Sequence, residues 1–208
     1  MKTEILSAED PFALPRAIEI LQLGELVAFP TDTVYGLGAL AFNGAAVESI
    51  YAAKDRPVEK AIPVLIGDTD DLAKVCAEVP EIALKLAAHF WPGPLTLVVP
   101  KHPELPQAVS GAPTVGVRIP DHPVARALLR LAGPMAVTSA NISGQPSPAT
   151  AQEVFAQLGG RIALIIDGGR TPGGVPSTVV DCNCAEPQVL RRGPISESEL
   201  LTISGQKI

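Results

Sequence analysis

Residues 115–138 read VGVRIPDHPVARALLRLAGPMAVT, in which two short apolar runs enclose a segment with helical spacing. The runs at 115–119 and 135–138 have the length and the composition of buried strands. Between them, Asp121 is predicted to cap a helix over residues 124–131, which Gly133-Pro134 ends. A strand, a helix and a strand in this order indicate a sheet that is covered by helices.

The same alternation extends outward along the chain. A first helix is predicted to begin at Asp10-Pro11, and the capping boxes at Thr150 and Ser196 predict two later helices. Residues 178–182 and 188–190 form two predicted strands without a helix between them, so the sheet should be mixed. We therefore expect one α/β domain over residues 1–208. The remaining strands are expected at 25–30, 61–66, 95–99 and 162–166, and the remaining helices at 45–54, 70–76 and 81–90.

The composition argues against several classes of protein. With 16 basic and 22 acidic residues the net charge is −6, so the chain lacks the overall positive field of a dedicated nucleic-acid-binding protein. The odd number of cysteines, three, argues against a disulfide framework. No apolar run approaches the ~20 residues that span a bilayer, and the first residues lack the apolar region of a secretion signal. The expected location is the cytoplasm, without attachment to a membrane.

Several polar segments follow predicted strands or helices, where α/β proteins place their ligands. Residues 29–38 (FPTDTVYGLG) include two glycines that would allow the backbone to approach a ligand, but taken alone the segment favours an Asx or threonine turn that closes a loop. Residues 54–60 (KDRPVEK) gather Lys54, Arg56 and Lys60, and such cations suit phosphate or carboxylate groups. The alternative is that Lys54 only offsets the dipole at a helix end.

Residues 138–148 (TSANISGQPSP) form a long loop with two prolines, which indicates function more than disorder. Ser139 and Asn141 stand two residues apart and would face the same side of an extended backbone. Arg118 lies within an apolar strand, which is unfavourable unless the arginine is paired or binds an anion. Ser177 opens a later predicted strand and Arg191 follows the last one, and we group both with Arg118 as candidate site residues.

Several catalytic motifs are absent from the sequence. There is no G-x-G-x-x-G, P-loop or G-x-S-x-G, and the three histidines lack metal-ligand spacing. The candidate residues supply cations, hydroxyls and amides but no nucleophile. Such a set suits nucleotidyl or phosphoryl transfer, where positioning and charge stabilisation do most of the catalysis.

Seven motifs occur in a fixed order: FPTDTVYGLG, KDRP, WPGPLTLVV, VGVRIPDHP, TSANISGQPSP, STVVD and LRRG. In this order, over roughly residues 25–193, they resemble the YrdC-type threonylcarbamoyl-AMP synthases in their short, single-domain form. The resemblance implies a twisted mixed parallel and antiparallel sheet flanked by helices, with a positively charged concave surface. It also implies a nucleotidyltransferase that converts L-threonine, bicarbonate and ATP into threonylcarbamoyl-AMP and pyrophosphate, for N6-threonylcarbamoyl modification of adenosine 37 in tRNA.

The resemblance also implies roles for individual residues. The family's K-x-R and S-x-N signature falls on catalytic candidates Lys54, Arg56, Ser139 and Asn141. Threonine would be bound by Thr33, Arg118, Thr138 and Ser177, and the nucleotide by Arg56, Lys60, Ser139, Ser147 and Arg191.

Two positions depart from the pattern of many members. Some members have His where this chain has Leu65, which bears on one threonine contact. Many have Pro where this chain has Arg192, so either Arg191 or Arg192 would contact the nucleotide.

The implied cofactor is Mg²⁺, bound with ATP. Its protein ligands stay open, because Asp32 is either one of them or part of an Asx turn. The product would pass to a tRNA threonylcarbamoyl-transfer complex, and a weak direct contact with tRNA is also expected. Two rival functions are an RNA-binding module that uses the same basic face and the carbamoyl adenylation of hydrogenase-maturation carbamoyltransferases.

Overall fold

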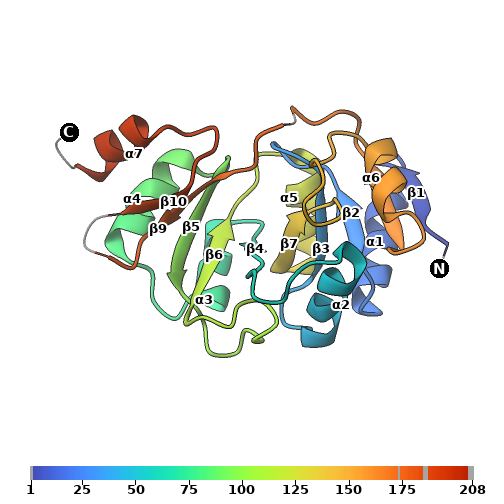
Figure 1. Cartoon of the computed structure of the whole chain (residues 1–208), viewed down its shortest axis with the longest axis horizontal. Coiled ribbons are helices and arrows are strands. Elements are labelled where there is room, and N and C mark those ends of the chain that lie inside the picture. The colour runs from blue at the N-terminus through green and yellow to red at the C-terminus, as the bar shows by residue number, and fades with distance from the viewer. Residues whose placement is uncertain (1, 173, 185–186, 206–208) are drawn as a thin grey trace.

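The structure is a computed structural model that describes residues 2–172, 174–184 and 187–205. Within these residues, strands and helices alternate along most of the chain (Figure 1). The strands are β1 Glu4–Ser7, β2 Val27–Phe29, β3 Gly36–Leu40, β4 Val64–Leu65, β5 Leu95–Pro100, β6 Thr114–Arg118, β7 Met135–Ser139, β8 Leu164–Asp167, β9 Thr178–Asp181 and β10 Gln188–Arg191. The helices are α1 Ala13–Gln22, α2 Gly44–Lys54, α3 Leu72–Val75, α4 Glu81–Phe90, α5 Pro123–Ala132, α6 Ala151–Leu158 and α7 Glu197–Ser204, with a 3₁₀ turn at Thr69–Asp71 before α3.

All these strands belong to one sheet, in the order β1-β8-β2-β3-β7-β4-β6-β5-β9-β10. The pairs β1–β8, β8–β2, β4–β6 and β5–β9 are parallel, and the remaining pairs are antiparallel. The predicted mixed α/β sheet is therefore confirmed.

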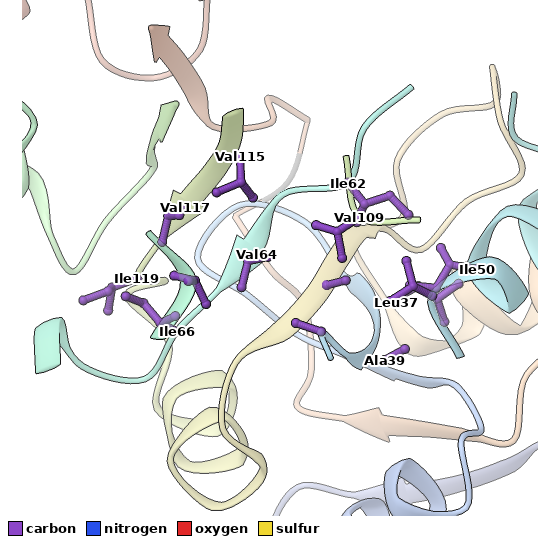
Figure 2. Close-up of a cluster of buried hydrophobic side chains, with 14 of the residues drawn as sticks. Leu37, Ala39, Ile50, Ile62, Val64, Ile66, Val109, Val115, Val117 and Ile119 are labelled. Atoms are coloured by element: carbon purple, nitrogen blue, oxygen red, sulfur yellow. The ribbon is translucent and has the colours of Figure 1, made fainter. Parts of the chain in front are cut away.

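Strand β2, in the first half of the sheet, is apolar on both faces. Val27 and Phe29 of β2 pack with α1 and α5 in one core, whereas Ala28 between them belongs to a second core that includes residues of α2 and α6. This follows from the two-residue period of a strand, which sends successive side chains to opposite faces. The second core runs across the sheet from Ile50 on α2 to Val115 on β6 (Figure 2). Helices on both faces thus enclose this half of the sheet.

In the second half of the sheet, one face packs in the hydrophobic core and the other lines a cleft. Leu95 and Leu97 of β5, with Val117 of β6, belong to the core that also includes residues of α3, α4 and α7. The alternating residues of the same strands, among them Thr96 and Arg118, line a cleft instead. The pattern of the strands therefore places polar side chains together on one face.

Some local predictions were wrong. The structure has two strands that the sequence analysis did not predict, β1 and β3, and β4 is shorter than the predicted 61–66 because Pro63 cannot donate to a ladder. Helix α1 begins at Ala13, since Asp10 Oδ1 accepts from Phe12 N in a turn before it. The N-cap of α5 is His122 and not Asp121, with Pro123 as the first helical residue. The capping residues Thr150 and Ser196 are confirmed.

Among the described residues, every helix is too short or too polar to cross a membrane.

Candidate functional site

A cleft of about 330 Å³ opens on the polar face of the sheet. It is bordered by the loop after β2, the loop after α2 and strands from both halves of the sheet. Seven of the predicted site residues line it: Thr33, Arg56, Arg118, Thr138, Ser139, Ser177 and Arg191. Residues that are up to 158 positions apart in the numbering, from Thr33 to Arg191, therefore meet in one place.

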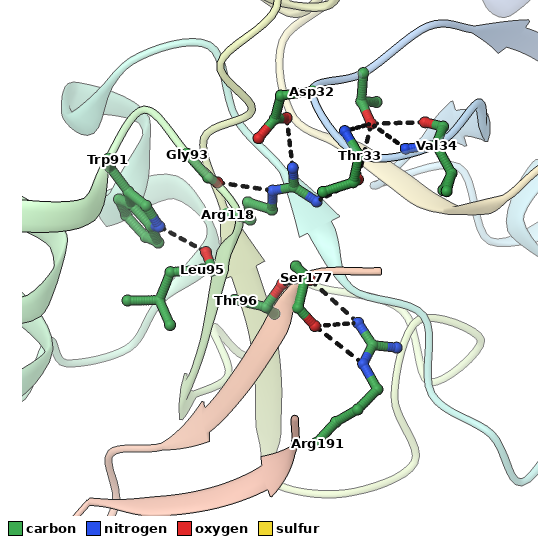
Figure 3. A network of polar contacts seen from close by, with 11 residues as sticks. Asp32, Thr33, Val34, Trp91, Gly93, Leu95, Thr96, Arg118, Ser177 and Arg191 are labelled. Carbon is green, nitrogen blue, oxygen red and sulfur yellow. Dashed lines mark hydrogen bonds and ion pairs between the residues drawn. The ribbon is translucent and has the colours of Figure 1, made fainter. Parts of the chain in front are cut away.

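Arg118 lies at the end of β6 and is only 6% exposed. Its Nε donates to the carbonyl oxygen of Gly93 at 2.9 Å, and its Nη1 donates to the hydroxyl oxygen of Thr33 at 3.2 Å (Figure 3). Its Nη2 forms an ion pair with Asp32 Oδ1. Burial lowers the pKa of Arg118 while Asp32 raises it, and a guanidinium stays charged in either case. The buried arginine thus has the carboxylate partner that its strand position requires, and it also lines the cleft.

The loop that carries Thr33 is fixed by hydroxyl hydrogen bonds. Thr31 Oγ1 donates to the carbonyl oxygen of Val34 at 2.6 Å and lies 3.1 Å from Thr33 Oγ1. Thr31 Oγ1 also accepts from the backbone N–H of Thr33 and Val34, as in a threonine turn. The turn that was an alternative explanation of residues 29–38 is therefore present, and it holds Thr33 at the cleft.

Gly36 and Gly38 are not in this loop but in β3. A Cβ on Gly36 would lie 2.7 Å from Val137 Cγ1, and one on Gly38 would lie 2.8 Å from Met135 Cε. These two glycines are needed for packing against β7. Gly36 also lines the cleft, whereas Gly38 does not.

Arg191 and Ser177 form the opposite side of the cleft. Arg191 Nε and Nη2 donate to the carbonyl oxygen of Ser177 at 3.0 and 2.8 Å, and Nη2 also donates to Ser177 Oγ at 3.1 Å (Figure 3). Burial, followed by the charges of Arg118 and Arg56, lowers the pKa of Arg191. Arg192, in contrast, is exposed and pairs with Glu197 at 3.1 Å. Of the two arginines, only Arg191 is among the residues that line the cleft.

Arg56 enters the cleft because the end of α2 turns sharply. Asp55, at the C-cap, has a left-handed backbone with φ of 52°, and its side chain pairs with Arg161 at 2.8 Å. Arg56 Nε and Nη2 then donate to the carbonyl oxygens of Lys60 and Ala61. Burial lowers the pKa of Arg56. A third guanidinium therefore faces the same cleft, held by neutral acceptors.

Lys54 lies behind the cleft and not among its lining residues. It is 1% exposed, and its ammonium donates to the carbonyl oxygens of Ser139 and Asn141. Burial lowers its pKa to about 7, and the charge of Arg56 adds to this effect. Lys54 is thus in contact with the backbone of the 138–148 loop, whereas its predicted catalytic role stays a prediction.

Three other predicted residues also lie outside the cleft lining. Asn141 Nδ2 donates to the carbonyl oxygens of Ile142 and Gln145, each at 2.8 Å, so this side chain braces the loop. Ser147 is half-buried in the same loop, and Lys60 is exposed. The predicted contacts of Ser147 and Lys60 with the nucleotide stay predictions, as does the predicted catalytic role of Asn141.

Charge distinguishes the cleft from the rest of this acidic chain. Three guanidinium groups line it, and the described lining residues include no carboxylate. Within the described part of the chain there is also no group of three or more His, Cys, Asp and Glu that could hold a metal. The Oδ2 atom of Asp32 is buried and has no hydrogen-bond partner among the described residues, but a single oxygen is too few ligands for the protein to hold Mg²⁺.

The sequence analysis named neither Thr31 nor Thr96 as a site residue, although both line the cleft, and Thr96 lies outside every polar segment that it selected. The Thr96 hydroxyl is buried on β5, 2.8 Å from Ser177 Oγ. Thr96 stands in the apolar run LTLVV, where a threonine reads as an ordinary strand residue. Its alternation with Leu95 and Leu97 was the available signal, because that places it on the face opposite the core.

These features define an α/β protein with a cationic cleft on one face of a twisted mixed sheet. The sequence model of one family, Sua5_yciO_yrdC, described as "Telomere recombination", matches residues 19–193. The chain belongs to this family.

Similar proteins support the assignment to the family. The chain is 46% identical over 206 residues to the threonylcarbamoyl-AMP synthase of Bacillus subtilis, and 45% identical over 192 residues to that of Pyrococcus abyssi. These matches cover 98% and 91% of this chain but only 59% and 56% of the two relatives, so the chain spans little more than half their length.

Solved structures share the fold. The crystal structure of P. abyssi Sua5 complexed with L-threonine has a TM-score of 0.93 and 41% identity, covering 99% of this chain and 62% of that one. The crystal structure of Escherichia coli YciO has a TM-score of 0.86 and 28% identity, covering 97% of this chain and all of YciO. The predicted YrdC-like fold is confirmed by both likenesses.

Proposed function

We propose that this protein is an L-threonylcarbamoyladenylate synthase, which converts L-threonine, bicarbonate and ATP into threonylcarbamoyl-AMP, pyrophosphate and water. The observation that supports this most directly is the convergence of Arg56, Arg118 and Arg191 on one cleft. The reaction brings together a carboxylate, a bicarbonate and a triphosphate, which repel one another in water. Fixed guanidinium groups offset this repulsion and lower the barrier by stabilising the charges.

The chemistry needs no nucleophile from the protein. The amine of threonine attacks the carbon of bicarbonate and loses a proton, and the hydroxide that leaves this carbon takes up a proton to become water. A carbamate oxygen attacks the α-phosphorus of ATP, and the bond to pyrophosphate breaks. The protein contributes position and charge. In our proposal, Arg118, Thr33 and Ser177 bind threonine, with Thr138 beside them, and Arg56, Ser139 and Arg191 bind the nucleotide.

Mg²⁺ would enter with ATP as part of the substrate. Because the described residues hold no carboxylate cluster, phosphate oxygens and water would provide most of its ligands, as is usual for Mg²⁺ with nucleotides. The ion would share the charge of the triphosphate.

The names of the two relatives and the binding of L-threonine by P. abyssi Sua5 support the choice of substrates. The product would then be passed to a tRNA threonylcarbamoyl-transfer complex in the cytoplasm. We do not favour the RNA-binding alternative, since the described lining residues of the cleft include no aromatic ring on which a base could stack.

The test is a pyrophosphate-release assay with MgATP in which L-threonine or bicarbonate is left out in turn. We expect release only when both are present, together with a product that contains threonine and AMP. Release that is independent of either substrate would overturn the proposal.

A further inference from the structure

The segment WPGPLT, residues 91–96, has no part in the chemistry described so far, yet it touches both sides of the cleft. The carbonyl oxygen of Gly93 accepts from Arg118 Nε, and the carbonyl oxygen of Pro94 accepts from the backbone N–H of Thr178 at 2.9 Å. Trp91 Nε1 donates to the carbonyl oxygen of Leu95 at 2.7 Å and so fixes the segment itself (Figure 3). The segment ends at Thr96, whose side chain reaches Ser177.

Thr96 and Ser177 form a buried hydroxyl pair. Their side-chain oxygens lie 2.8 Å apart, and the two residues are 3% and 4% exposed. Arg191 Nη2 donates to the same Ser177 oxygen at 3.1 Å. Both hydroxyl residues line the cleft. Among the described residues, Ser177 Oγ therefore has two hydrogen-bonding neighbours, Thr96 and Arg191.

Counting protons and lone pairs limits what Ser177 can offer to a ligand. A hydroxyl has one proton and two lone pairs, and the guanidinium of Arg191 can only donate, so it occupies one lone pair. If Ser177 donated its proton to Thr96, only a lone pair would remain for the cleft, and a lone pair repels an anion. If Thr96 donates, both lone pairs of Ser177 are occupied, and its proton is free for an anionic acceptor.

We propose that Thr96 is a positioning residue that donates to Ser177 Oγ, so that Ser177 presents its proton to an anionic oxygen of the substrate. This inference deepens the proposed function and rests on it in part, since we take the substrate to be L-threonine with its carboxylate. The role of Thr96 is exerted through Ser177 and requires no contact of its own with the ligand.

The first experiment compares Thr96→Val with Thr96→Ser. Valine keeps the shape of threonine, including the methyl group Cγ2 that lies towards Gly116, but it removes the hydroxyl. We expect Thr96→Val to raise KM for L-threonine about tenfold with little change in kcat, and Thr96→Ser to stay within about twofold of the wild type. Thr114→Val, which removes a hydroxyl from β6 outside the cleft lining, is the matched control and should change neither. An unchanged KM in Thr96→Val would overturn the inference.

The second experiment is a double-mutant cycle with Ser177→Ala. If Thr96 acts through Ser177, then Thr96→Val should have no further effect once the Ser177 hydroxyl is gone. A merely structural role, or a direct contact of Thr96 with the substrate, would give effects that add up, and additivity would overturn the inference.

Failure of the inference about Thr96 can be distinguished from failure of the proposed function. If pyrophosphate release by the wild type does not depend on threonine and bicarbonate, the proposed function fails. The same cycle, measured as calorimetric binding of L-threonine, then still tests Thr96. Uncoupled effects on binding overturn the inference alone, and a wild type that binds no L-threonine overturns both.

Discussion

The buried ammonium of Lys54 is hydrogen-bonded to the carbonyl oxygen of Ser139, across 85 positions of the sequence. This contact joins the end of α2 to the end of β7, and a second one to the carbonyl oxygen of Asn141 extends it into the following loop. Ser139 faces the cleft, and Lys54 lies behind it. The sequence groups Lys54 with other cations as if on the surface, whereas in the structure it is buried and holds the backbone of the loop beside the cleft.

The buried state of Lys54 predicts how stability depends on pH. Its pKa is about 7 in the folded protein, below the ordinary value of 10.5, so between these values the unfolded chain binds more protons than the folded one. The free energy of unfolding should therefore rise with pH over this window, by up to about 1.4 kcal/mol per pH unit from this group. Lys54→Met lacks this titration, so in urea unfolding at pH 7 and pH 9.5 the wild type should gain more stability than the variant. Equal changes in the two proteins would contradict the prediction.

Removing Arg118 should destabilise the fold as well as the site. Arg118→Gln leaves the carboxylate of Asp32 buried without its cation, and breaking a buried ion pair in this way costs about 3–5 kcal/mol. Urea unfolding monitors the loss. The double variant Arg118→Gln with Asp32→Asn should recover part of it, since no unpaired charge is left. A single variant within about 1 kcal/mol of the wild type would show that the pair is not structural.

Arg191 and Arg192 should differ in their effects on activity. Arg191→Ala removes a guanidinium from the cleft and the hydrogen bonds that hold Ser177, so we expect pyrophosphate release to fall by at least about 100-fold in kcat/KM. Arg192 is exposed, and Arg192→Ala is the matched control, with activity within about twofold of the wild type. The opposite order would reassign the nucleotide contact to Arg192.

A group of surface ion pairs around Asp68 predicts a second way in which the free energy of unfolding depends on pH. Arg130 and Arg126 donate to the carboxylate of Asp68 and lower its pKa from 3.8 to about 2. The stabilisation is therefore present above pH ~4 and lost as the pH falls towards 2. Because Asp68 is 44% exposed, solvent screens the pairs, and Asp68→Asn should lower the free energy of unfolding at pH 7 by only about 1 kcal/mol. The difference from the wild type should shrink towards pH 2.5, whereas Asp70→Asn, at an exposed neighbour, should show little effect at either pH.

The fold was predictable where the pattern of apolar residues is regular, as in residues 115–138. Strand β3 escaped prediction because Gly36 and Gly38 resemble a loop, and only their packing against Val137 and Met135 on β7 explains them. The site residues were found mainly through the order of the motifs. Their arrangement was not predictable from local sequence, since Lys54 is buried by a loop that lies far from it along the chain.

Strand β4 consists of only two residues, Val64 and Leu65, and it pairs with β7 on one side and β6 on the other. The two halves of the sheet are therefore joined through ladders of only two residue pairs on each side of β4. The cleft extends across β4. Arg56 and Ser139 come from one side of this strand, and Arg118, Ser177 and Arg191 come from the other. A ligand that contacts both groups would bind only when the two halves of the sheet are together. Binding in the cleft would therefore raise the free energy of unfolding of the chain.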